Sequence, residues 1–125
     1  MKRRTAREYA LQILYPLDMN YKEPTVAIKD FLESDEADPF LTKLVEGVIN
    51  HLEEIDEMII KHLENWSLET IATVEKTILR IATYEMTFED EIPKEVSINE
   101  AVEIAKKFGD VKSGKFVNGI LSKML

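Results

Sequence analysis

The sequence predicts an all-α fold, with about seven helices in a single domain that covers residues 1–125. Apolar residues recur at spacings of three and four along most of the 125-residue chain, which is the period of an amphipathic helix. No segment of useful length alternates between apolar and polar residues, as a half-buried strand would. Four glycines and four prolines are too few for the many tight turns of most all-β folds. The length is close to the commonest size of one domain.

The first expected helix covers residues 3–15. Ala6, Ala10 and Leu14 recur at helical spacing and predict its buried face. Pro16 should kink or end this helix, because proline lacks a backbone donor and its ring clashes with the carbonyl one turn back.

Two acidic residues that precede prolines mark the next two helix starts, Glu23-Pro24 and Asp38-Pro39. Proline suits the first helical position, and an aspartate before it caps the free amides. An acidic loop separates these two expected helices. After Asp38 the apolar ladder continues as far as Leu63, and it predicts one long helix over residues 39–64.

The second half of the chain predicts a short turn and then another helix. Ser67 can cap a turn that reaches Ile71. Apolar residues then recur at helical spacing over residues 73–88, which predicts a helix there, and Pro93 lies in the loop that follows.

Two further helices are expected near the C-terminus. Ser97 and Glu100 have the spacing of a capping box, so we expect a helix to begin at Ser97. It should end near Phe108, because Gly109 suits a left-handed helix cap. The last helix is expected to begin near Ser113.

Composition excludes several classes of protein. The chain has no cysteine, which removes disulfides, thiolate catalysis, iron–sulfur clusters and zinc fingers. No apolar run approaches the roughly 20 residues of a membrane span, and no apolar signal core follows the basic N-terminus. We therefore expect a cytoplasmic protein that does not associate with membranes.

The charge is unevenly distributed along the chain. The net charge is −8, yet residues 1–15 carry four basic and one acidic residue, and residues 106–125 carry five basic and one acidic residue. Residues 16–105 carry 7 basic and 22 acidic residues. Such asymmetry indicates two surfaces with different partners. The alternative is an ordinary solvated acidic surface with basic ends.

Residues 109–116 come close to a phosphate-binding loop of nucleotide hydrolases. The last position of that motif should be Ser or Thr and is Phe116 here, and the segment follows a helix instead of a strand. Nucleotide hydrolysis is therefore disfavoured. A helix N-terminus near Ser113, flanked by Lys112 and Lys115, still suits a phosphate group, and a plain helix cap is an equal alternative.

No catalytic or metal site is expected. His51 and His62 lie eleven positions apart, near one face of the long helix, but they lack the spacing of a known metal motif and a third ligand. No carboxylate pair is singled out for acid–base chemistry, and no nucleophile has a base and an orienting group. We therefore expect neither an enzyme nor a bound cofactor.

Basic residues near the N-terminus are the best candidates for binding. Lys2, Arg3, Arg4 and Arg7 lie within about one helical turn of each other and could grip successive phosphates. A solvated basic run is the alternative. Phe116 could stack on a nucleic-acid base, although a place in the core is the competing interpretation.

Several blocks of sequence resemble the NusB family of bacterial transcription antitermination factors. They occur in the family's order and cover nearly the whole chain except residues 20–64. The blocks are Arg4 to Glu8 followed by Ala10-Leu11-Gln12 and Leu14-Tyr15, then Trp66-Ser67-Leu68, then Val74-Glu75-Lys76 with Leu79-Arg80-Ile81-Ala82 and Tyr84-Glu85, then Ile92-Pro93 with Val96 and Ile98 to Lys106, and finally Lys115 to Leu121.

This resemblance implies two three-helix bundles and a regulator of transcription that acts without catalysis. It implies binding of the single-stranded boxA RNA element of ribosomal RNA transcripts. It also implies a heterodimer with the small-subunit ribosomal protein NusE, within an antitermination complex on RNA polymerase. The free protein would be a monomer or a homodimer.

The resemblance also implies the residues of each surface. Those matching the family's RNA side are Lys2, Arg3, Arg4, Arg7, Lys112, Ser113, Lys115 and Phe116. Those matching the NusE side are Tyr15, Glu69 and Glu75. Pro16 departs from the family pattern, in which the first helix continues. The chain ends at Leu125, so we expect no RNA contact from a tail beyond the last helix.

One alternative keeps the same fold and changes its use. The acidic middle of the chain would make it a protein-interaction scaffold with weak or no RNA binding of its own.

Overall fold

The computed structural model describes residues 1–36 and 38–125, and every regular element in these residues is helical. The all-α prediction is thereby confirmed. None of these helices is both long enough and apolar enough to cross a lipid bilayer. The elements are α1 (Arg3–Leu17), α2 (Pro24–Leu32), α3 (Pro39–Asn50), α4 (Leu52–Lys61), the short 3-10 helix η1 (Leu68–Thr70), α5 (Thr73–Phe88), α6 (Lys94–Phe108) and α7 (Val111–Ser122).

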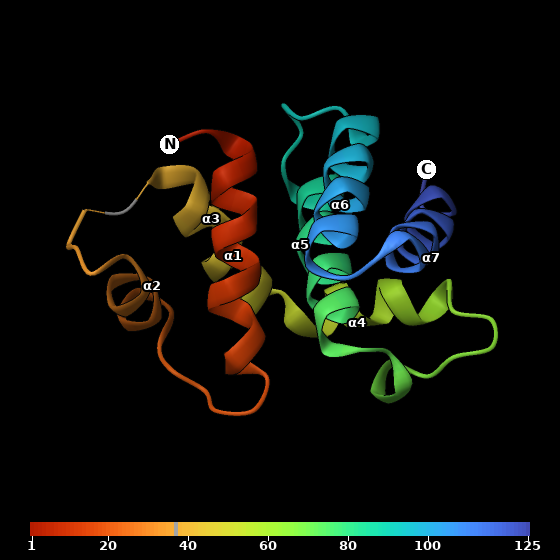
Figure 1. Ribbon diagram of the computed structural model, residues 1–125, viewed down its shortest axis with the longest axis horizontal. Helices are drawn as coiled ribbons and strands as arrows, with labels where there is room; N and C mark the ends of the chain where they lie inside the picture. The colour runs from red at the N-terminus through yellow and green to blue at the C-terminus, as the bar shows by residue number, and fades with distance from the viewer. Residues whose placement is uncertain (37) are drawn as a thin grey trace.

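The helices form two groups that pack against each other, as Figure 1 shows. α1, α2 and α3 contact one another, and α5, α6 and α7 do the same, with α4 against α5. α1 and α3 both pack on α5, so α5 joins the two groups. This arrangement agrees with the two three-helix bundles that the family resemblance implies.

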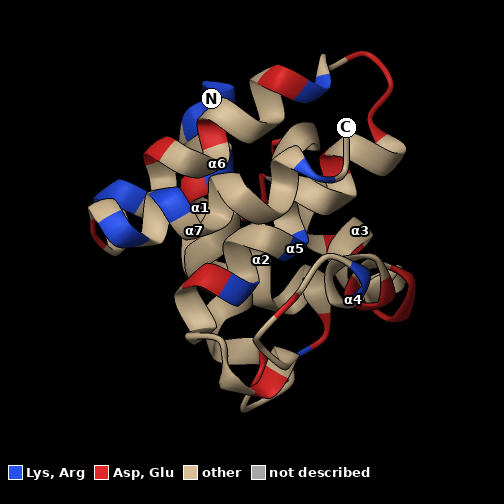
Figure 2. Cartoon of the chain, turned by 90° about the vertical axis from the view of Figure 1, so that its right-hand side faces the viewer, with Lys and Arg blue, Asp and Glu red and all other residues tan. Residues whose placement is uncertain are grey.

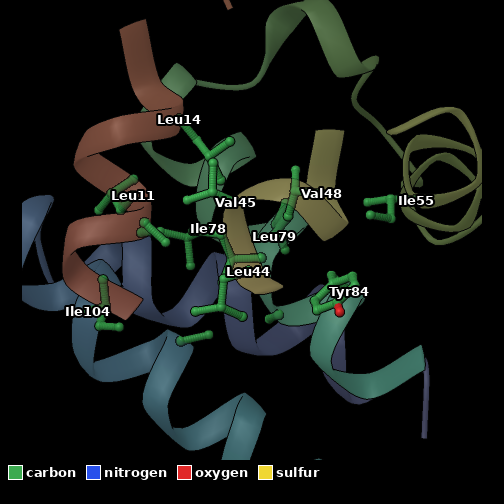
Figure 3. Close-up of a cluster of buried hydrophobic side chains, with 14 of the residues drawn as sticks. Leu11, Leu14, Leu44, Val45, Val48, Ile55, Ile78, Leu79, Tyr84 and Ile104 are labelled. Atoms are coloured by element: carbon green, nitrogen blue, oxygen red, sulfur yellow. The ribbon is translucent and has the colours of Figure 1, made fainter. Parts of the chain in front are cut away.

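A shared apolar core lies where α1 and α3 meet α5. Figure 3 shows Leu11 of α1, Leu44 and Val48 of α3, and Ile78 and Leu79 of α5 gathered there. All five side chains are buried. Burial of each such side chain contributes about 1.5–3 kcal/mol, so this seam holds the two groups together.

The two expected helix starts at prolines are confirmed. The Glu23 carboxylate accepts a hydrogen bond from the Val26 amide at 3.2 Å, and the Asp38 carboxylate accepts one from the Leu41 amide at 3.0 Å. In both helices proline occupies the first turn, where its missing N–H removes no helical hydrogen bond.

The prediction of one long helix over residues 39–64 is wrong. The helix breaks at His51, whose backbone leaves the helical region at φ −117° and ψ 22°, and α4 ends at Lys61. The His51 ring stacks on Phe88 of α5 with 4.2 Å between ring centroids. The break lets α3 pack within the first group while α4 follows α5. An apolar ladder cannot reveal it, because both halves keep the same period.

Ser97 does not cap a helix, contrary to the sequence prediction. α6 begins three residues earlier, at Lys94, immediately after Pro93. Ser97 is buried inside it and its hydroxyl donates to a Glu85 carboxylate oxygen at 3.0 Å. The Ser97 and Glu100 side chains therefore bond to residues on other helices, and the capping-box spacing is coincidental.

The junction between α6 and α7 also differs from expectation. Gly109 ends α6 as predicted, but with φ −118° and ψ −117°, which is not the left-handed cap. α7 then begins at Val111, and Asp110 is its cap, since the Asp110 carboxylate accepts from the Ser113 amide at 2.8 Å. Ser113 is thus the third residue of the helix and not its start.

Pro16 lies inside the last turn of α1 and does not break the helix. The helix continues through Pro16 and stops one residue later at Leu17. The last helical turn tolerates the proline, and the Pro16 carbonyl accepts the amides of Met19 and Asn20 as the chain turns away.

The predicted short turn after Ser67 is confirmed as η1. The Ser67 amide donates to Thr70 Oγ1 at 3.1 Å, and the Thr70 hydroxyl is 2.8 Å from the Ser67 carbonyl. Helix α5 over residues 73–88 is also confirmed.

Candidate nucleic-acid interface

The start of α1 places three basic side chains at the surface. Lys2, Arg3 and Arg4 are all exposed. The Arg3 guanidinium lies 5.1 Å from the centre of the Phe40 ring, a cation–π contact that orients it without neutralising its charge. This end of the helix therefore presents positive charge to solvent.

Arg4 is already paired with a carboxylate of α6. Its Nε donates to Glu100 Oε1 at 2.9 Å, and a terminal nitrogen donates to Glu100 Oε2. The guanidinium therefore makes a bidentate contact with the carboxylate. The hydrogen bond from Arg4 lowers the pKa of Glu100 below its ordinary value. About half of the Arg4 side chain remains exposed. A phosphate group reaching Arg4 would therefore share it with Glu100 or displace Glu100.

Arg7 has a different environment from its neighbours and is only 4% exposed. Its Nε and one terminal nitrogen each donate to the Glu85 carboxylate at 2.8 Å, and its other terminal nitrogen lies 3.3 Å from Glu100. Glu85 is 1% exposed and also accepts from Ser97. In this conformation Arg7 is not available to a phosphate group. It joins α1 to α5 and α6 instead.

The start of α7 supplies the second group of predicted residues. Lys112 and Lys115 are exposed, whereas Ser113 is buried and its side chain engages Asp110. Phe116 is half-buried and meets the Trp66 ring edge to face, with 5.9 Å between ring centroids. Phe116 thus packs against the core on one side and faces an exposed aromatic ring on the other.

Helix α6 lies between the two basic groups. Figure 2 shows blue segments near the N-terminus and again along the same edge of the molecule near α6 and α7, with red segments between them. Lys106 and Lys107 of α6 are exposed, and Lys107 pairs with Glu8 of α1 at 2.9 Å. The residues assigned to RNA therefore share one side of the molecule but do not form an uninterrupted basic patch.

The residues assigned to a protein partner lie toward the other end of α1. Tyr15 is 46% exposed and borders a groove of about 430 Å³ between α1, α2, α5 and the end of α6. Glu75, half-buried in the first turn of α5, directly follows Val74, which lines the same groove. Glu69 is exposed on η1.

The other segments and residues considered for catalysis or metal binding are held by ordinary packing and hydrogen bonds within the fold. Residues 109–116 form the junction of α6 and α7, with no strand before them. His51 stacks on Phe88, and His62 Nδ1 lies 2.8 Å from the Met58 carbonyl oxygen. Among residues 1–36 and 38–125, no three His, Asp or Glu side chains gather as metal ligands would.

Sequence reasoning did not include Glu85, Glu100 or Trp66 in the site. The two glutamates became visible only when α5 and α6 were placed beside α1. The pairing of Trp66 with Phe116 likewise joins segments that are fifty residues apart.

Comparisons with known proteins agree with the resemblance seen in the sequence. The model of the NusB family matches residues 4–125. A transcription antitermination protein NusB of Bacillus licheniformis is 54% identical over 124 residues, which cover 99% of this chain and 96% of the relative. That of Bacillus subtilis is 52% identical, with 99% and 95% covered.

Solved structures agree with the fold over its full length. NusB of T. maritima superposes with a TM-score of 0.88 at 36% identity, covering 99% of this chain and 90% of the other. A complex of the antitermination factors NusB and NusE with double-stranded RNA contains a chain with a TM-score of 0.86 at 34% identity, covering 98% and 94%.

Proposed function

Because the chain belongs to the NusB family, we propose that it is a transcription antitermination factor that binds boxA-type single-stranded RNA together with ribosomal protein NusE. In that role it supports processive transcription of ribosomal RNA operons as part of the antitermination complex on RNA polymerase. The observation that carries the proposal is the family match over residues 4–125.

The proposed RNA surface uses the exposed basic residues of α1 and α7. Lys2, Arg3 and Arg4 at one end, and Lys112 and Lys115 at the other, hold phosphates by charge. Phe116 offers a ring on which an unpaired base stacks. Arg7 and Ser113 act indirectly: Arg7 fixes α1 against α5 through Glu85, and Ser113 closes the cap of α7.

The proposed NusE surface combines Tyr15, near the end of α1, with Glu69 and Glu75 from the acidic middle of the chain. Tyr15, Glu69 and Glu75 contact the partner, and the groove beside Tyr15 receives an apolar side chain from it. Acidic groups on this side favour a basic ribosomal protein through complementary charge, which raises the rate of association.

The protein acts by binding and carries out no reaction, and it works in the cytoplasm where RNA is transcribed. RNA and NusE occupy separate surfaces, so both bind at once. The contribution of this chain is to hold the two in one complex.

Fluorescence anisotropy tests the proposal with a labelled boxA strand and a scrambled strand of equal length, each with and without NusE. We expect preference for boxA and tighter binding when NusE is present. Arg4→Ala should weaken RNA binding. Lys22→Ala should not, because Lys22 lies between α1 and α2, where it is exposed and paired with Asp30 of α2.

Two outcomes would contradict the proposal in different ways. Equal binding of both strands in all conditions would remove the RNA function. The scaffold alternative would be favoured if Glu75→Lys abolished NusE binding and if RNA binding were seen only when NusE was present.

A further inference from the structure

A second groove lies between the loop after α4 and helix α7. It has a volume of about 230 Å³, and its walls include Asn65 and Trp66 from the loop, Lys115 and Phe116 from α7, and Lys123 just after α7. The groove is smaller than the roughly 300–1,000 Å³ of drug-sized ligand pockets. Its size therefore suits one planar ring system. We call it the Trp66 groove.

Two aromatic rings from distant parts of the chain form one corner of the Trp66 groove. Trp66 and Phe116 meet at an interplanar angle of 79°. Trp66 nevertheless remains 55% exposed, so Phe116 does not cover the indole. A large aromatic surface left open beside a cavity offers a stacking platform, because every nucleic-acid base has a π-face.

The polar groups around the groove suit a nucleotide. Lys115 is exposed next to Phe116, and Lys123 lies about two turns further on, just after the end of α7. The Lys123 ammonium pairs with the exposed Glu64 carboxylate at 2.9 Å. Glu64 repels a phosphate at that end, so the backbone of a bound strand is directed toward Lys115.

Two side chains of the loop could read the edge of a base. Asn65 carries both a donor and an acceptor on its amide, as base edges require. The Nδ1 atom of His62 is engaged by the Met58 carbonyl oxygen, which leaves Nε2 as the ring nitrogen available to a ligand.

We propose that the Trp66 groove binds one unpaired RNA base, stacked on the indole of Trp66 next to Phe116. This inference rests on the proposed RNA-binding function and extends its surface across α7 to the loop of residues 62–67. The extended surface is continuous, because Lys115 and Phe116 belong to both parts.

The chain contains one tryptophan and four tyrosines, so emission excited selectively from tryptophan reports on the surroundings of Trp66. The first experiment titrates the free chain with the unlabelled boxA strand and follows tryptophan emission. We expect saturable quenching at the concentrations at which anisotropy shows binding.

The second experiment measures RNA affinity by anisotropy in the presence of NusE for three variants. Trp66→Ala should raise Kd about tenfold, the effect of losing one base-stacking contact. Trp66→Phe should recover part of the loss. Tyr21→Ala is the matched control, since it removes an aromatic side chain that is 67% exposed near the start of α2.

Thermal unfolding separates a binding role from a structural one. Trp66→Ala should melt within a few degrees of the unmodified chain, because the side chain is mostly exposed. The proposal for the Trp66 groove would be overturned if Trp66→Ala and Tyr21→Ala bound RNA with equal affinity, or if RNA bound without any change in tryptophan emission. The proposed function would then still stand. Absence of RNA binding by the unmodified chain with NusE would overturn both.

Discussion

Arg4 and Arg7 show how one helical turn separates two roles for the same residue type. Both lie on α1 and both approach Glu100. Arg4 reaches it from the surface, whereas Arg7 is enclosed by α5 and α6 and pairs with the buried Glu85. A buried charge costs several kcal/mol in desolvation unless it is paired, so the Arg7–Glu85 pair must stay intact in the folded protein.

We expect Arg7→Ala to lower the free energy of unfolding by about 3–5 kcal/mol, because it leaves the Glu85 carboxylate buried and unpaired. Arg4→Ala should cost about 1 kcal/mol or less, since its pair is half exposed. Urea denaturation followed by circular dichroism measures both.

A double variant provides the control for this prediction. Arg7→Met combined with Glu85→Leu removes both charges and should recover most of the stability lost in Arg7→Ala. If Arg7→Ala were no less stable than Arg4→Ala, the buried pair would not hold α1 in place.

At the scale of elements, the packing of α3 on α5 depends on a glycine. A Cβ atom added at Gly47 would overlap the ring carbons of Tyr84. The Tyr84 ring cannot easily move, because its hydroxyl is 2.9 Å from the Glu89 carboxylate and the residue is 7% exposed. Burial raises the pKa of Tyr84 to about 12, so the hydroxyl keeps its proton at neutral pH.

Gly47→Ala should therefore destabilise the protein by about 1–3 kcal/mol through overpacking, although alanine is the better helix former. Gly119→Ala is the matched control: it also lies within a helix, and an added Cβ meets nothing within 4 Å. We expect Gly119→Ala to raise stability by about 0.5–1 kcal/mol.

Thermal unfolding of the two glycine variants checks this prediction. A rise in melting temperature for both would mean that helix propensity alone governs these positions and that the contact between Gly47 and Tyr84 is dispensable.

At the scale of the whole molecule, the basic residues of the two chain ends lie on one side, with acidic residues between them. The two ends come to the same side because α6 packs on α7 and its Glu100 and Lys107 bond to residues of α1. The net charge of −8 would repel RNA from most of the surface. Binding must therefore depend on a small number of local phosphate contacts.

The number of phosphate contacts predicts the salt dependence of RNA binding. For single strands the slope of log K against log salt is about −0.7 for each phosphate neutralised. Four or five basic contacts therefore predict a slope of about −3. Anisotropy titrations in the presence of NusE at several salt concentrations measure it.

Single lysine variants test the same prediction. Lys112→Ala should make the slope shallower by about 0.7, whereas Lys22→Ala should leave it unchanged. A slope near zero for the unmodified chain would contradict phosphate binding by these residues.

The sequence predicted the helices well wherever local signals define them. The prolines after Glu23 and Asp38 mark helix starts through backbone chemistry that needs no tertiary partner. The spacing of Ser97 and Glu100 failed as a cap because both side chains bond across helices. The break at His51 was hidden for a similar reason, since its ring packs on α5.

The sequence by itself determined the helical class, the family and the charge of the two ends, because these follow from local periodicity, residue order and composition. Tertiary structure alone decided which basic side chains remain free. Arg4 and Arg7 are equivalent in the sequence, and only the approach of Glu85 and Glu100 buries one of them. It also placed Trp66 beside Phe116. Accessibility depends on contacts between residues distant in the chain, and no local pattern encodes those.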